Sequence, residues 1–174
     1  PHYYEHKRPQ VEAMRHALDV VLAVGREYGE LTGREYGYFF PYRTDDAELI
    51  IVGMGSFAGT AMEAVDIARD EGVPVGLLKL RLFRPFPKDA LFEALKEARA
   101  VCVFDRAISF GLGGPLVHEI RALFQERGLN TPVASAIYGL GGRDITEHDI
   151  AAHIKRTWEA LNAQALSTEP TYLT

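Results

Sequence analysis

Apolar residues follow two different patterns along this chain, one typical of an amphipathic helix and one typical of buried strands. Between Pro9 and Gly33 they recur at alternating steps of three and four, at Val11, Met14, Leu18, Val21, Gly25 and Tyr28. This spacing predicts an amphipathic helix of about six turns whose apolar stripe needs a partner surface. The aromatic segment 35–42 follows. Because Pro41 has no N–H for a sheet ladder, this segment predicts an edge strand or a packed loop.

From residue 47 onward, short continuous apolar runs alternate with segments typical of helices. Strands are predicted at 49–52, 75–80, 100–104 and 132–138, and helices at 60–70, 88–99, 116–128 and 147–161. Apolar strands separated by helices predict a mostly parallel sheet covered on both faces, which is a three-layer α/β/α fold. We therefore expect a helix and aromatic segment at 1–46 that pack on neighbouring domains, an α/β domain at 47–165 and a tail at 166–174.

Composition and charge narrow the class of protein. The chain has 174 residues, 47% of them hydrophobic, and a net charge of −5, which argues for one soluble globular domain and against a general nucleic-acid binder. Its one cysteine, Cys102, excludes an internal disulfide, a multi-cysteine zinc site and an iron–sulfur cluster built from this chain alone. No apolar run approaches the roughly 20 residues that cross a bilayer, so a cytoplasmic protein without a membrane partner is expected.

The loops after the predicted strands are the candidate binding regions, because ligands bind beyond the carboxyl ends of parallel strands. Segment 53–58 fits the Gly-x-Gly-x-x-Gly/Ala dinucleotide fingerprint between a strand and a helix. Lys79 and Arg81 stand where an NAD site carries an acid, so NADP is the dinucleotide to consider. The alternative is a tight structural turn with no ligand.

Cations and glycines recur at several of these strand ends and predict an electropositive rim for an anion or coenzyme A. The candidate rim residues are Gly55, Ser56, Arg84, Arg106, Gly113 and Arg143. In the alternative interpretation these arginines pair with Asp45, Asp105 and Asp144 and only hold the loops together; Asp105 could instead cap the following helix, and Asp144 or Thr146 could cap the last one.

The remaining polar residues of interest carry no catalytic or metal site. His148 and His153 lie five residues apart, on different faces of the last predicted helix, so we interpret them as surface or interface residues. Cys102 falls inside a predicted strand and is expected to be an inert core residue.

Three segments read together resemble a known family. Segments 76–87, 105–114 and 138–146 resemble the second domain of the pyruvate:ferredoxin oxidoreductase family, the transketolase carboxyl-terminal-like half of the alpha subunit. The resemblance runs from about residue 6 to residue 158 and includes the Asp45–Glu48 lead into the first glycine turn.

The resemblance implies an assembly that oxidatively decarboxylates a 2-oxo acid, most simply pyruvate, with coenzyme A, thiamine diphosphate, Mg²⁺ and iron–sulfur clusters, and that passes electrons to ferredoxin. This chain lacks the family's Gly-Asp-Gly…Asn thiamine diphosphate signature. The resemblance therefore implies an inactive structural domain that contacts other domains or subunits and carries no catalytic residue. The competing hypothesis is a free-standing NADP-binding domain.

Overall fold

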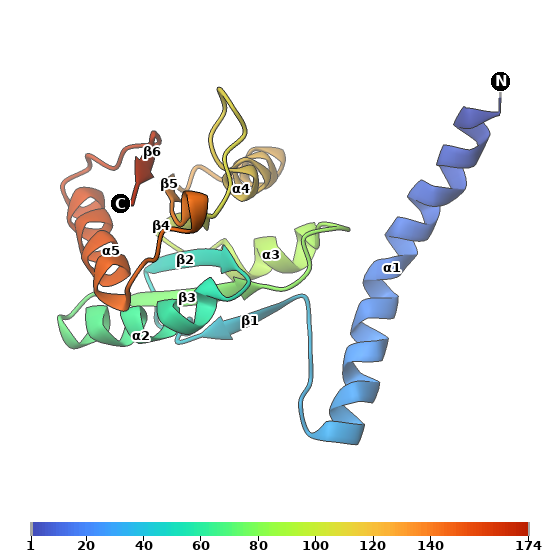
Figure 1. Ribbon diagram of the computed structural model, residues 1–174, viewed down its shortest axis with the longest axis horizontal. Coiled ribbons are helices and arrows are strands. Elements are labelled where there is room, and N and C mark those ends of the chain that lie inside the picture. Colours follow the sequence, from blue (N-terminus) through green and yellow to red (C-terminus); the bar gives the residue numbers. More distant parts are fainter. Residues whose placement is uncertain (1, 174) are drawn as a thin grey trace.

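The computed structural model describes residues 2–173 and shows one α/β domain with a long helix standing beside it (Figure 1). The helices are α1 (Tyr3–Thr32), α2 (Phe57–Asp70), α3 (Lys88–Leu95), α4 (Pro115–Glu126) and α5 (Glu147–Asn162), with a short 3₁₀ turn η1 (Leu140–Gly142). The strands are β1 (Phe39–Tyr42), β2 (Leu49–Met54), β3 (Val75–Leu80), β4 (Ala100–Asp105), β5 (Val133–Ile137) and β6 (Pro170–Tyr172).

The six strands form one sheet in the order β1-β3-β2-β4-β5-β6. β1 is antiparallel to β3, and every other neighbouring pair is parallel. Helices α2 and α5 cover one face and α3 and α4 cover the other, each with its own buried apolar cluster. The predicted three-layer fold is confirmed.

Burial on both faces explains why the strands read as continuous apolar runs. In β2, Leu49 and Ile51 belong to the cluster under α2 and α5, whereas Ile50 and Val52 belong to the cluster under α3 and α4. Side chains alternate between the two faces of a strand, so a central strand needs an apolar residue at every position. This requirement is why the sequence locates the central strands well.

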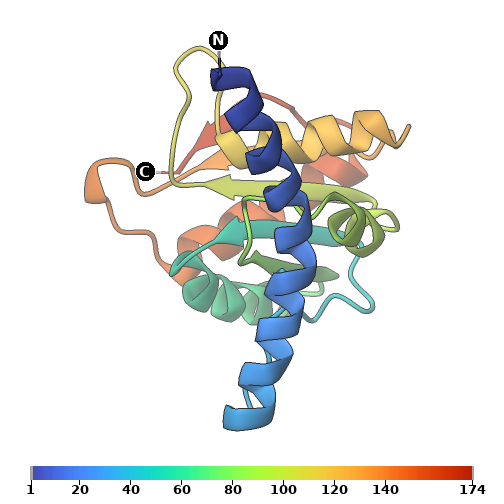
Figure 2. The same cartoon turned by 90° about the vertical axis from the view of Figure 1, so that its right-hand side faces the viewer.

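Helix α1 begins earlier than the sequence predicts and packs little against the domain. It starts at Tyr3, so Pro9 lies inside it, and it ends at Thr32. The next residue, Gly33, forms a left-handed cap with its positive φ of 72° and its N–H bond to the carbonyl of Gly29. In Figures 1 and 2 the helix runs past one end of the α/β domain. Gly25 is its one buried residue within the described part of the chain.

The aromatic segment after α1 connects this helix to the sheet. Its last part forms β1, so of the two predicted alternatives the edge strand is present, and its Pro41 pairs with Leu78 of β3. The Tyr38 hydroxyl donates a hydrogen bond to the carbonyl of Leu18 at 3.0 Å. The carbonyl of Tyr36 comes so close to α1 that a Cβ at Gly25 would lie 1.9 Å from it.

The segment predicted to be a tail contributes to the sheet. Residues 170–172 form β6 and pair in parallel with β5, with Thr171 opposite Ala136. Three residues beginning with proline carry too little pattern to predict a strand, so the sequence missed it. No helix between residues 2 and 173 has the length and apolar character needed to span a bilayer.

Candidate functional site

The strand order creates a crevice at one edge of the sheet. The chain leaves β2 toward β3 on one side, while β4 lies on the other side of β2, so the loops after β2 and β4 diverge. Such a topological switch point is where open α/β sheets bind ligands. Here it holds a pocket of about 190 Å³, which we call the switch-point pocket, lined by Ser56, Phe57, Thr60, Arg106, Tyr138, Gly139, Arg143, Asp144 and Ile145.

Stacked aromatic rings lie beside this pocket. Phe57 lies 4.8 Å from Phe104 and 4.8 Å from Tyr138, measured between ring centroids. A side chain at Gly53 would collide with Phe57, since its Cβ would lie 2.6 Å from that ring. Gly55 has φ 73°, which lets the chain turn from β2 into α2. Packing and turn geometry thus account for both glycines of the fingerprint without a dinucleotide.

Two arginines from different loops line the switch-point pocket. The Arg106 Nε–H donates to the carbonyl of Gly139 at 3.3 Å, which holds the side chain across the loop after β5. Neither Arg106 nor Arg143 makes an ion pair with any residue between 2 and 173. Burial raises the pKa of Tyr138, and the positive charge of Arg106 opposes that rise.

Asp105 does not pair with Arg106, so that interpretation is wrong; it caps α4 instead. Its two carboxylate oxygens accept hydrogen bonds from the backbone N–H groups of Leu116 at 3.0 Å and Val117 at 3.1 Å. Asp105 is only 2% exposed, and burial raises its pKa although both hydrogen bonds favour the charged form. The positive end of α4 is therefore occupied by a carboxylate of the same chain.

Other helix starts differ in how they are capped. Thr146 and Asp149 form a capping box at α5, as one of the sequence alternatives expected for Thr146. Ser56 begins α2 without a side-chain hydrogen bond to the helix. The N-terminus of α2 thus faces the switch-point pocket without a side-chain cap of its own.

The remaining rim residues lie elsewhere, so the six do not form one continuous rim. Arg84 pairs with Glu119 of α4, not with Asp45, and its guanidinium lies 4.1 Å from the centroid of the Phe83 ring. Gly113 is buried beside the side chains of Pro170 and His118. Only Gly55, Ser56, Arg106 and Arg143 gather around the switch point.

His153 is buried, which corrects the expectation that it is a surface or interface residue. It is 5% exposed, and its Nε2 lies 3.7 Å from the Cys102 Sγ. Burial lowers the pKa of His153 to about 4, with a contribution from the charge of Arg156, and burial raises the pKa of Cys102 to about 12. The ring is neutral and the thiol protonated at neutral pH, in line with an inert core cysteine. No group of three or more potential metal ligands forms among residues 2–173.

An apolar groove lies between α1 and the aromatic segment. It measures about 560 Å³ and is lined by Val20, Val21, Val24, Gly25, Tyr28, Tyr36, Gly37, Arg81 and Leu82. The Arg81 guanidinium lies 4.5 Å from the Tyr36 ring centroid and 5.6 Å from that of Phe40. This cation, which an NADP site would use, is instead held by the aromatic segment.

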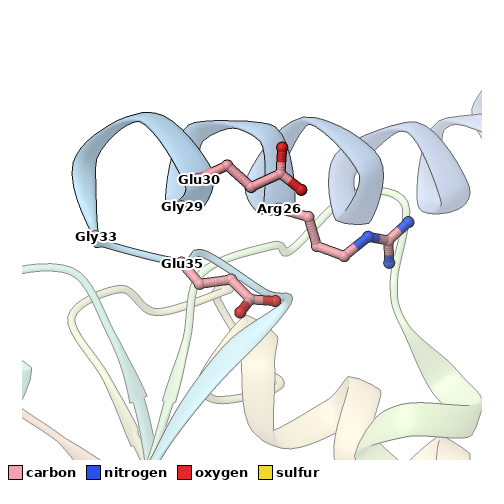
Figure 3. A pocket seen from close by; sticks show the side chains of 5 residues that line it. All are labelled: Arg26, Gly29, Glu30, Gly33 and Glu35. Carbon is pink, nitrogen blue, oxygen red and sulfur yellow. The ribbon is translucent and has the colours of Figure 1, made fainter.

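A second, charged hollow of about 380 Å³ lies at the end of α1, between the helix and the segment that follows it (Figure 3). Arg26 and Glu30 approach it from the helix and Glu35 from the segment beyond Gly33. No ion pair within residues 2–173 joins these three side chains. We therefore treat it as a corner between two elements and assign it no chemistry.

Two solved structures share the fold of this chain. A 2-oxoglutarate:ferredoxin oxidoreductase from Magnetococcus marinus, solved with 2-oxoglutarate, coenzyme A and succinyl-CoA bound, matches 70% of this chain and 20% of its own at a TM-score of 0.54 and 24% identity. A split-gene transketolase matches 72% of this chain and 43% of its own at a TM-score of 0.57 and 16% identity. These two likenesses support the transketolase-like fold.

Similarity in sequence identifies the family of this chain as well as its fold. The family model for pyruvate:ferredoxin oxidoreductase core domain II matches residues 47–150. Pyruvate synthase subunit PorA of Thermotoga maritima is 41% identical over 99% of this chain, and ketoisovalerate oxidoreductase subunit VorA of Pyrococcus horikoshii is 40% identical over 86% of it. The chain spans 43% and 38% of these two relatives, less than half of each. It belongs to the pyruvate:ferredoxin oxidoreductase family, of which it carries core domain II.

Proposed function

We propose that this chain is a structural and interaction domain of a multi-subunit 2-oxo acid:ferredoxin oxidoreductase that oxidatively decarboxylates pyruvate with coenzyme A. Family membership and the relatives named as pyruvate synthase subunits support the reaction class. Membership of this family does not favour the competing hypothesis that the chain is a free-standing NADP-binding domain. The proposed location is the cytoplasm, and the proposed partners are the other domains or subunits of the assembly and, through them, ferredoxin.

The residues present do not fit the thiamine diphosphate, Mg²⁺ or iron–sulfur groups that the family implies. The chain lacks the Gly-Asp-Gly…Asn signature, and the carboxylate of Asp105 at the switch point is already bound to the start of α4. The thiol of Cys102 is buried and has no second cysteine beside it to share a cluster. We therefore place these groups in other parts of the assembly and derive no catalytic step in this chain.

The exposed apolar side of α1 is the observation that carries the interaction role. Val20 and Val24 are 56% and 55% exposed, and Tyr28 is 45% exposed, although all three line the apolar groove. Isolated apolar side chains are common on surfaces, but a continuous apolar patch around a groove marks a contact surface. Helix α1 offers the domain little packing of its own, so we infer that a neighbouring domain or subunit covers it.

Co-purification tests this role. Val24→Asp puts a carboxylate in the groove, whereas Arg15→Asp puts one on the opposite side of the same helix, nine residues or two and a half turns away. The tagged chain is co-expressed with the other subunits of the assembly and with the region that its relatives have and this sequence does not span. Val24→Asp should reduce recovery of the partners and pyruvate-dependent electron-acceptor reduction, while Arg15→Asp should leave both unchanged. Equal recovery with both variants would contradict the role of α1.

Calorimetry of the chain alone tests the second part of the proposal. We expect no binding of thiamine diphosphate in the presence of Mg²⁺ and no acceptor reduction with pyruvate. Stoichiometric, Mg²⁺-dependent binding of thiamine diphosphate would show that the cofactor site lies in this chain.

A further inference from the structure

The switch-point pocket brings together two positive charges that the rest of the domain does not neutralise. Several other cationic side chains meet carboxylates, as Arg84 meets Glu119 and Lys155 meets Glu71, whereas others have no ion pair within the described residues. Around the pocket, Arg106 and Arg143 approach from the loops after β4 and after β5, and neither is ion-paired within residues 2–173. Asp144 also lines the pocket, so its walls retain a net charge of one positive unit.

Among the residues that the structure describes, the terminal donors of Arg106 are free for a ligand. The single side-chain hydrogen bond of Arg106 uses Nε, so both of its terminal nitrogens have no acceptor among residues 2–173. That bond also holds the side chain against Gly139, which reduces the rotamer entropy that binding would cost. Ser56 adds a hydroxyl at the uncapped start of α2, a 14-residue helix whose dipole favours a negative charge there.

The size of the pocket selects a small group. Its volume of about 190 Å³ lies below the roughly 300–1,000 Å³ of sites that enclose a drug-sized ligand. A dinucleotide does not fit inside, whereas one tetrahedral oxyanion does. Arginine matches phosphate because its planar guanidinium presents parallel N–H donors to two oxygens.

We propose that the switch-point pocket binds a phosphate group, with Arg106, Arg143 and the Ser56 hydroxyl as its donors. The phosphate is either the free ion or a phosphate of a larger molecule whose remainder lies outside the pocket. Among the reactants of the activity proposed above, coenzyme A carries phosphates, so its identification as the source rests on that proposed function. Arg84 and Gly113 have no part in this site because they lie against α4 and β6.

Nuclear magnetic resonance of the 174-residue chain tests the site directly. The Nε–H signals of arginine are followed while inorganic phosphate or coenzyme A is added at low ionic strength. We expect saturable shifts of Arg106 and Arg143 with at least one of the two ligands. Arg143→Gln should weaken binding on the order of tenfold, because hydrogen bonds to charged groups contribute about 1.5–3 kcal/mol. The matched control Arg84→Gln removes the same charge away from the pocket and should leave the affinity unchanged.

The outcomes separate the source of the phosphate from the existence of the site. Saturation by phosphate but not by coenzyme A supports the site and overturns coenzyme A as its source. Absence of saturable shifts with both ligands overturns the site, as does equal weakening by Arg143→Gln and Arg84→Gln, which would indicate nonspecific attraction. Because co-purification through α1 does not involve this pocket, failure here leaves the interaction role standing.

Discussion

Replacing Asp105 should destabilise the domain through the start of α4. Asp105→Ala removes the acceptor of two backbone N–H groups, those of Leu116 and Val117, in a place that is 2% exposed. Loss of a helix N-cap costs about 1 kcal/mol, and an unsatisfied buried donor costs about 1–3 kcal/mol. The substitution also removes the cost of burying a carboxylate, which offsets part of that sum. We therefore expect the free energy of unfolding to fall by about 2 kcal/mol.

Urea unfolding followed by far-ultraviolet circular dichroism measures this loss. With a slope of about 2 kcal/mol per molar urea, a loss of about 2 kcal/mol lowers the midpoint by about 1 M. Asp144→Ala is the matched control, because Asp144 is exposed on the same edge and makes no hydrogen bond through its side chain within residues 2–173. If the two variants unfold at the same midpoint, the cap of Asp105 does not stabilise the domain.

The pH dependence of the same group gives a second, independent check. The folded-state pKa of Asp105 is raised above its usual value of 3.8, so the folded chain holds this proton more tightly than the unfolded chain. The stability that this tighter proton binding contributes is fully present below pH 3.8, and it is lost as the pH rises through the pKa of Asp105 in the folded chain. The stability advantage of the wild type over Asp105→Asn should therefore shrink as the pH rises from about 4. An advantage that stays constant or grows would show that the carboxylate is not destabilised by burial.

Three further predictions concern two glycines in helices and the buried thiol. Gly59→Ala should stabilise the domain by about 0.5–1 kcal/mol in thermal unfolding, because a Cβ at this position meets no atom within 4 Å. Gly25→Ala, in contrast, should separate α1 from Tyr36 and speed hydrogen exchange in the aromatic segment, because its Cβ would collide with the carbonyl of Tyr36. A slower exchange in Gly25→Ala would contradict the close contact. Cys102 should resist a thiol reagent at pH 8 in the folded chain and react in urea, since its thiol is buried and its pKa is about 12. Labelling at equal rates in both conditions would show that the core around His153 opens freely.

The bounds of the central strands could be predicted from the sequence alone. The strand β3 has the predicted bounds 75–80, and β2, β4 and β5 differ from prediction by at most two residues at either end. The start of α1 differs more from prediction: the predicted helical pattern begins at Pro9, whereas α1 begins at Tyr3. Proline costs one backbone hydrogen bond inside a helix, and no local signal shows whether the helix continues across it.

The interaction partners of polar side chains, in contrast, could not be predicted from the sequence. Arg84 was a candidate for the rim and for pairing with Asp45, but α4 brings Glu119 to it across the sheet face. His153 is predicted to be a surface or interface residue, but the packing of α5 over β4 places its ring in the core beside Cys102. Charge and residue type suggest what a side chain can do, whereas the choice among several possible partners depends on how helices lie on the sheet.

The sequence by itself determined the fold class and the loops that follow the strands, because burial on both faces of a parallel sheet and tight strand-to-helix turns leave local patterns in composition and spacing. The family came from the resemblance of segments 76–87, 105–114 and 138–146 to known sequences. The strand order is not local. It decides that the loops after β2, β4 and β5 meet at one switch point, and so it brings Ser56, Arg106 and Arg143 together while leaving Arg84 and Gly113 outside. The pairing of β6 likewise depends on long-range hydrogen bonds that three residues cannot encode.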